Sequence, residues 1–190
     1  DTITLILTPA IICLVAGALL AGVNSMTSDR IDQANSQKKL DALKEVLPTY
    51  DNSPDGNTVT VEHGGQSWTF SVAIKDGAFA GAAVETSSAA GYGGDIVLML
   101  GINADEQTQA IAILGQKETP GLGANIEADS FKSLFASKDI RTTTWAVTKD
   151  GGEIDQITAA TISSRAVTDA VKAAIDAYLA NADIIKETGL

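Results

Sequence analysis

Hydroxyl side chains gather in one segment, residues 155–164, which reads Asp-Gln-Ile-Thr-Ala-Ala-Thr-Ile-Ser-Ser. The β-branched residues Ile157 and Thr158 are typical of a strand end, and they lead into a turn and then into a periodic helical pattern. A helix N-terminus carries unpaired N–H groups and the positive end of the helix dipole, so a phosphate at Thr161 or Ser163 would be held electrostatically. The simpler interpretation is an N-cap, because Ser and Thr cap helices without any ligand. On residue types alone, the N-cap is favoured.

Other chemistries are limited by the few metal-binding side chains. The chain has one cysteine, Cys13, and one histidine, His63. A single cysteine cannot form an internal disulfide, a Cys₄ metal or iron–sulfur site, or a C-x-x-C pair. A Ser/His hydrolase would need a nucleophilic serine, and the sequence contains no G-x-S-x-G motif. His63 precedes Gly64-Gly65 and is therefore interpreted as a hairpin residue. We expect no metal site, and any electron transfer would need an organic cofactor.

Charge and glycine patterns exclude further classes. The formal charge is −11, and no basic cluster stands out. Because affinity for nucleic acids comes from neutralised phosphates, DNA, RNA and anionic lipid headgroups are poor partners. The glycines in Gly91–Gly94 and Gly121–Gly123 complete neither G-x-G-x-x-G nor a P-loop. They are interpreted as turns that need positive φ.

The N-terminal elements predict a membrane anchor. Residues 2–28 contain no Asp, Glu, Lys, Arg or His, and a spanning helix needs about 20 such residues. We expect a transmembrane anchor over residues 1–28. The alternative is a cleaved signal peptide, whose apolar region is shorter, about 7 to 15 residues. A weak helical pattern and a turn-rich stretch follow, predicting a stalk helix that Pro48 ends and a linker, together residues 29–57.

Residues 58–190 are expected to form a single domain that contains strands in its middle. Alternation over Trp68–Ile74 predicts a half-buried strand, and Asp76-Gly77 a hairpin turn after it. The apolar runs Ile96–Leu100 and Ala110–Leu114 predict central strands buried on both faces.

The remaining elements are two helices and two short strands. A short helix is predicted over Ser130–Ser137 with Asp129 as its cap, and short strands over Thr143–Thr148 and Glu153–Ile157. An apolar stripe from Ala166 to Leu179 predicts a long helix packed on the sheet. Strands in the middle with flanking helices indicate an α+β fold with a mostly antiparallel sheet.

Three motifs together resemble one family. Residues 155–164 resemble the D-x-[LI]-[ST]-G-A-T-x-[ST]-S motif of FMN-binding domains, although Ala159 stands where that motif usually has glycine. Gly-Tyr-Gly-Gly at 91–94 and Lys-Glu-Thr-Pro-Gly-Leu-Gly at 117–123 precede it in the family's order. The whole chain thus resembles the G subunits of Rnf electron-transport complexes. This family is related to the C subunit of the sodium-pumping NADH:quinone oxidoreductase.

The resemblance implies a covalent FMN. Its phosphate would be esterified to the hydroxyl of Thr161. Gly91 would allow close backbone approach, Lys117 would offset charge on the reduced flavin, and Asp155 would serve recognition by the flavin transferase. The other residues implied to bind the cofactor are Tyr92, Gly93, Glu118, Thr119, Gly121, Leu122, Thr158, Ala160, Ser163 and Ser164.

The resemblance also implies a role and a location. The protein would relay electrons between ferredoxin and NAD, coupled to Na⁺ or H⁺ translocation, as one subunit among the other Rnf subunits and not as a complete enzyme. Its domain would face the periplasm from the cytoplasmic membrane. One alternative is an anchored extracytoplasmic binding or scaffold domain without cofactor. Another is an FMN-domain membrane protein of a different system, which usually has further spans or cysteine clusters.

Overall fold

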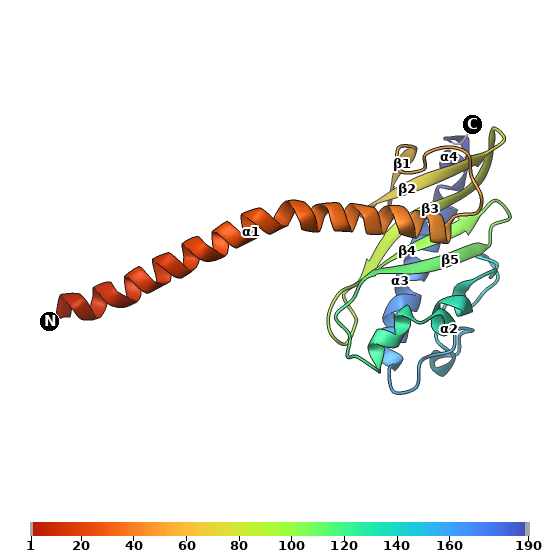
Figure 1. Cartoon of the computed structure of the whole chain (residues 1–190). Helices are drawn as coiled ribbons and strands as arrows, with labels where there is room; N and C mark the ends of the chain where they lie inside the picture. The colour runs from red at the N-terminus through yellow and green to blue at the C-terminus, as the bar shows by residue number, and fades with distance from the viewer. Residues whose placement is uncertain (1, 189–190) are drawn as a thin grey trace. The chain divides into compact units, whose positions relative to one another are not determined.

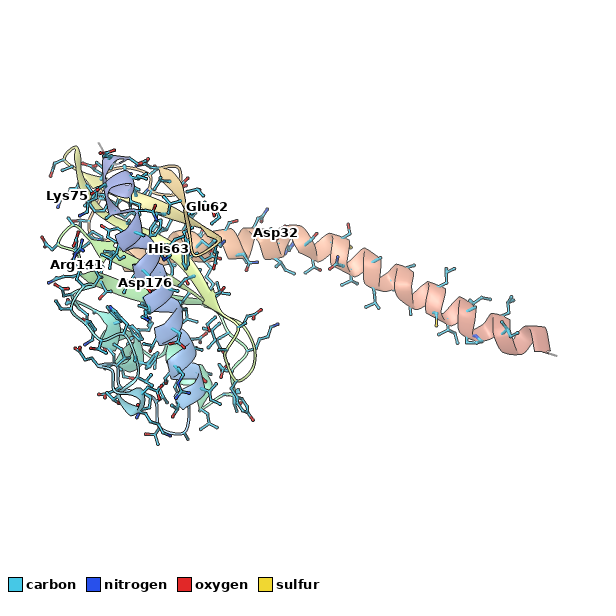
Figure 2. The ribbon with its side chains drawn as sticks, turned by 180° about the vertical axis from the view of Figure 1, so that it is seen from behind. Asp32, Glu62, His63, Lys75, Arg141 and Asp176 are labelled. Atoms are coloured by element: carbon cyan, nitrogen blue, oxygen red, sulfur yellow. The ribbon has the colours of Figure 1, made fainter. Side chains whose placement is uncertain are left out.

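The computed structural model describes residues 2–188, which divide after Lys39 into an N-terminal helical unit and a folded domain. Helix α1 runs without a break over Thr2–Val46. In its N-terminal unit the described apolar side chains are exposed and project from all sides of the helix (Figure 2). Within residues 2–188, α1 is the one helix that is long and apolar enough to cross a membrane, and a signal sequence would share these properties.

The domain is built on one five-stranded sheet (Figure 1). Its strands pair antiparallel in sequence order, which confirms the predicted α+β class. The strands are β1 (Thr58–His63), β2 (Gln66–Lys75), β3 (Ala78–Ser88), β4 (Ile96–Asn103) and β5 (Thr108–Gly115).

Two tight hairpins set the register of β1 to β3. Gly64-Gly65 (φ 61° and 76°) joins β1 to β2, with His63 opposite Gln66, and Asp76-Gly77 (φ 52° and 75°) joins β2 to β3. Two successive positive φ values match the right-handed twist of paired strands. Both predicted turns are confirmed, whereas β1 and β3 were missed. The Ala- and Gly-rich β3 has weak strand propensity and is fixed by its two neighbours.

Each face of the sheet is covered by a helix. Helix α3 (Thr161–Ala180) crosses one face (Figure 2), and its Tyr178 ring lies 6.0 Å from that of Phe70. The other face carries the end of α1, where Leu43 and Val46 pack near Met99. This second cover explains why β4 is buried on both faces, as predicted. It also makes Leu40 the start of the compact domain, earlier than the expected residue 58.

Other sequence predictions were wrong in part. β5 lies at the edge of the sheet and is not central. The predicted strands Thr143–Thr148 and Glu153–Ile157 reduce to one bridge, between Val147 and Ile154. Backbone hydrogen bonds such as Thr148 N–H to Ile154 O join the two segments around this bridge, and the N–H groups at 144 and 149 donate instead to the side chains of Glu153 and Gln156.

The predicted short helix also differs in its start and its regularity. It comprises α2 (Asp129–Lys132) and a 3₁₀ turn, η2 (Ser133–Phe135). Asp129 is its first helical residue and not its cap; its carboxylate lies 3.2 Å from the Lys132 ammonium. Three further short helical segments are η1 (Gly123–Glu127), η3 (Thr148–Asp150) and α4 (Ala182–Glu187).

Candidate functional site

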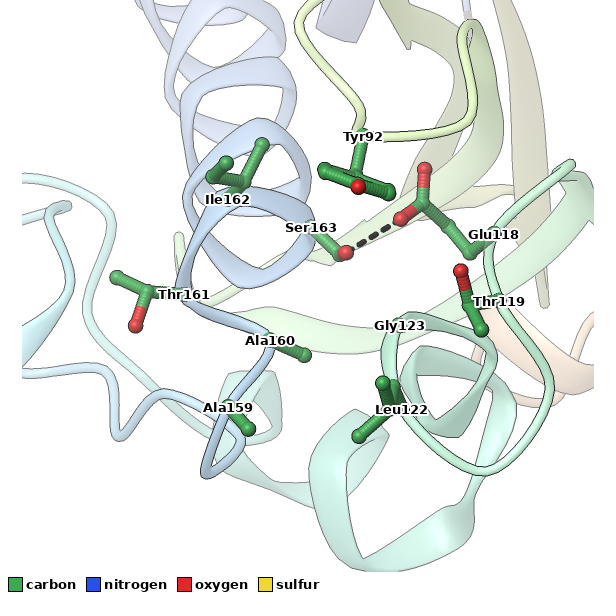
Figure 3. A pocket seen from close by; sticks show the side chains of 10 residues that line it. All are labelled: Tyr92, Glu118, Thr119, Leu122, Gly123, Ala159, Ala160, Thr161, Ile162 and Ser163. Atoms are coloured by element: carbon green, nitrogen blue, oxygen red, sulfur yellow. Dashed lines mark hydrogen bonds between the residues drawn. The ribbon is translucent and has the colours of Figure 1, made fainter.

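A cavity of about 580 Å³ lies at the N-terminal end of α3. Three segments meet around it: the loop between β3 and β4, the loop after β5, and the turn that enters α3 (Figure 3). Its lining residues are Tyr92, Glu118, Thr119, Leu122, Gly123, Ala159, Ala160, Thr161, Ile162 and Ser163. The volume is within the usual range of small-molecule and cofactor sites, about 300–1,000 Å³.

The cavity is surrounded by exposed apolar side chains. Tyr92, Leu122 and Ile162 are 73%, 44% and 47% exposed. Among the described residues after Leu40, the only other large hydrophobic side chain exposed to this degree is Ile184. Three of these four residues therefore line one cavity, and such a gathering on a folded domain marks a binding surface.

Among residues 2–188, no side chain caps the first turn of α3. Its N-cap residue is Ala160, which has no side-chain hydrogen-bonding group. The Ser164 hydroxyl instead accepts the Ile157 N–H (3.0 Å) and donates to the Ala160 carbonyl (3.0 Å), so it fixes the turn before the helix. The N-cap interpretation is therefore wrong. The first N–H groups of α3 remain available to an external acceptor.

The turn into α3 depends on an unusual backbone conformation. Ala159 has φ 63°, in the left-handed region that side chains disfavour. It is exposed and lines the cavity. The backbone at this position thus explains why glycine is usual there in the motif that the segment resembles.

Thr161 is the first residue of α3 and is half-buried. Figure 3 shows its hydroxyl pointing away from Ser163 and Glu118, and among residues 2–188 it has no hydrogen-bond partner. Four residues later, on the same side of the helix, Arg165 donates two hydrogen bonds to Asp150, at 2.6 and 2.9 Å. This guanidinium lowers the pKa of the Asp150 carboxyl. The Thr161 hydroxyl and the Arg165 guanidinium, paired with Asp150, thus lie on the same side of the first two turns of α3.

Glu118 connects the three segments of the cavity. Its side chain is buried, and Oε1 accepts the Gly93 N–H at 2.8 Å. Oε2 accepts the Ser163 hydroxyl at 2.5 Å, the contact drawn in Figure 3. Its own N–H donates to Gln116 Oε1 at 2.6 Å. The carboxylate therefore holds the loop before β4 and the start of α3 to the loop after β5.

Glycines make room for this arrangement. A Cβ added at Gly93 would lie 1.9 Å from the Lys117 carbonyl oxygen, and one at Gly123 would lie 2.5 Å from both Glu118 Oε2 and Ser163 Oγ. A Cβ at Gly91 would lie 2.8 Å from Glu118 Oε1. The prediction that these glycines are needed for positive φ is wrong, because close approach is what requires them.

Positive φ does occur at two other positions of these clusters. Gly94 has φ 118° and Gly121 has φ 77°. Only these two therefore fit the turn interpretation.

The structure brings most of the predicted site residues together. Seven of them line the cavity: Tyr92, Glu118, Thr119, Leu122, Ala160, Thr161 and Ser163. Gly93 and Ser164 act beside it through the hydrogen bonds described above. Four other predicted residues are exposed and do not line the cavity: Lys117, Gly121, Asp155 and Thr158. Their binding roles stay predictions.

Sequence reasoning missed three lining residues, Gly123, Ala159 and Ile162, as binding residues. Ile162 carried a signal, since it lies off the apolar stripe of α3 and yet is a large hydrophobic residue. Gly123 belongs to the 117–123 motif, but its close contact with Ser163 joins two segments distant in sequence and could not be read from the motif.

Comparisons with known proteins agree with this geometry. The FMN-binding domain family matches residues 91–176, and the family described as RnfG N-terminal region matches residues 5–46. The chain is similar to the G subunit of the ion-translocating oxidoreductase complex of Aliivibrio fischeri, with 34% identity over 89% of this chain and 86% of that protein.

Two further relatives carry the same name. The protein from Stutzerimonas stutzeri is 36% identical over 86% of this chain and 74% of its own length. The one from Methanosarcina acetivorans is 34% identical over 90% of this chain and 91% of its own length.

Proposed function

The chain belongs to the family of G subunits of ion-translocating oxidoreductase complexes, and from this premise we propose that it is a membrane-anchored electron carrier with FMN bound covalently at Thr161. The observation that carries the proposal is the start of α3. There a helix N-terminus and a threonine hydroxyl, neither with a side-chain partner in the described part of the chain, adjoin a cavity with an apolar rim.

The cavity suits the two chemically distinct parts of FMN. The apolar side chains of Tyr92, Leu122 and Ile162 suit an aromatic ring system. The free N–H groups of the first turn and the helix dipole suit a phosphate, and the Thr161 oxygen suits its ester. The guanidinium of Arg165 lies one turn away, where it is paired with the Asp150 carboxylate.

Bound FMN would supply reversible uptake of electrons, which no side chain of this chain provides. The chain's own residues have other tasks. The first turn of α3 holds the phosphate, the rim excludes water from part of the ring, and Glu118 keeps the surrounding loops in place. The ester at Thr161 prevents loss of the carrier.

The proposal also covers the complex in which the protein works and its place in the membrane. The carrier would work with the other Rnf subunits in a path between ferredoxin and NAD, coupled to Na⁺ or H⁺ movement. A flavin transferase would install FMN, and the domain would lie on the periplasmic side of the cytoplasmic membrane. The names of the relatives support a place in an ion-translocating oxidoreductase complex, and the long apolar helix α1 before an acidic domain supports the membrane anchor.

In-gel flavin fluorescence after denaturation tests the attachment. Full-length protein would be made in cells that contain the transferase, as wild type, Thr161→Ala and the control Thr58→Ala, at an exposed threonine of β1 outside the cavity. We expect fluorescence and the added mass of FMN in wild type and control, and neither in Thr161→Ala. Fluorescence that survives Thr161→Ala would reject Thr161 as the site. A colourless wild type would favour the scaffold alternative.

Membrane extraction tests the anchor. We expect the protein to stay in the membrane fraction at high salt and to enter solution only with detergent, because the apolar residues of α1 are exposed. Release by salt alone would instead indicate a cleaved signal.

A further inference from the structure

A buried carboxylate without a cationic partner forms part of the cavity wall. Glu118 is 6% exposed and lines the cavity. No Lys or Arg side chain of the described residues forms an ion pair with it; the adjacent Lys117 is exposed and lies outside the lining. Its oxygens are held only by an N–H and an O–H group. A charge so placed is screened much less than one in water.

The surroundings of Glu118 are shaped to keep the carboxylate there. Gly91 and Gly123 leave the space that its oxygens occupy, since a Cβ at either position would lie within 2.8 Å of one of them. Two segments far apart in sequence donate to it, through Gly93 and Ser163. The side chain is thus fixed at the cavity wall and cannot turn out to solvent without breaking both bonds.

We propose that Glu118 sets the redox potential of the flavin by placing a fixed negative charge beside the cavity. This inference rests on the proposed function. A nearby negative charge opposes the addition of an electron to a bound group, so it favours the oxidised form and lowers the midpoint potential. Glu118 thus positions the loops around the cavity and tunes the midpoint potential of the flavin through its charge, without contact with the reacting atoms.

Two substitutions separate this electrostatic role from a structural one. Glu118→Gln removes the charge but keeps the shape, and its amide can still bond to the Gly93 N–H and to the Ser163 hydroxyl, which both donates and accepts. Ser163→Ala keeps the charge and removes one donor that partly neutralises it. We expect the potential to rise in Glu118→Gln and to fall in Ser163→Ala. A loosened cavity would shift both in the same direction.

A matched control is Glu62→Gln, which removes the same charge from an exposed carboxylate of β1 outside the cavity. Because solvent screens that charge, the midpoint potential of the flavin in this control should equal that of the wild type.

The experiment is a spectroelectrochemical titration of the flavinylated full-length protein in detergent. We expect the equilibrium constant for electron uptake to rise about tenfold in Glu118→Gln, or about 59 mV for a one-electron couple. A potential of Glu118→Gln equal to that of Glu62→Gln would overturn the inference while the flavin stays attached. If Glu118→Gln does not fold, Ser163→Ala decides: a lower potential supports the inference, and an unchanged or higher one overturns it. A wild type without flavin would refute the proposed function, and this inference with it.

Discussion

Ala159→Gly should stabilise the domain, although glycine normally does the opposite. Ala159 has φ 63°, a conformation that costs an L-residue about 1–2 kcal/mol. Glycine removes that cost but adds about 0.4–1 kcal/mol through the greater entropy of the unfolded chain. Because Ala159 is exposed, little packing is lost with its methyl group. The difference between the midpoints of these two ranges gives an expected net gain of about 0.8 kcal/mol in the free energy of unfolding.

Urea unfolding of the full-length protein in detergent measures this gain. Both tryptophans, Trp68 and Trp145, are buried in the domain, so their fluorescence reports its unfolding. The matched control is Ala136→Gly, at φ −77°, where alanine is unstrained. It should lower the free energy of unfolding by about 0.4–1 kcal/mol. Equal or lower stability of Ala159→Gly relative to wild type would show that position 159 carries no strain, and would refute the reasoning.

Three further changes test other contacts. Gly93→Ala would place a Cβ 1.9 Å from a facing carbonyl oxygen, so urea unfolding should show a loss of about 1–3 kcal/mol; unchanged stability would mean that the loop yields freely. Arg141 and Lys186 lower the pKa of Glu106 from 4.5 to about 2, so Glu106 contributes stability above pH 4.5 that is lost as pH falls toward 2. The melting temperature of Glu106→Gln should therefore lie below that of wild type at pH 7 and depend less on pH between 5 and 2; parallel profiles would contradict this. The Tyr178 hydroxyl is buried without a partner in the described chain, so Tyr178→Phe should raise the free energy of unfolding by about 1 kcal/mol, and a clear loss would reveal a hydrogen bond to water.

Local rules gave the parts of the fold whose signals lie within a few residues. The hairpin turns at Gly64-Gly65 and Asp76-Gly77 follow from the backbone freedom of glycine beside strand residues. The apolar stripe of α3 follows from its spacing. The resemblance of residues 155–164 to a known motif directed attention to the end of that helix that lines the cavity.

Local rules failed where side chains compete with the backbone for the same N–H groups. Segment 143–157 has residues typical of strands, yet the side chains of Glu153 and Gln156 accept the backbone N–H groups at 144 and 149. Ser and Thr residues at the start of α3 suggested a cap, but Ser164 bonds to the preceding turn. Propensity alone cannot decide between such partners, because their distances are set by packing.

The sequence by itself determined the apolar helix, the acidic domain, the hairpins and the order of three motifs, since each depends on composition or on short spacings. Only the tertiary structure decided that Glu118 is a buried link between Gly93 and Ser163, and that Tyr92, Leu122 and Ile162 surround one cavity. The physical reason is that burial and hydrogen bonding between residues 25 and 45 positions apart arise only when the sheet and α3 bring their ends together.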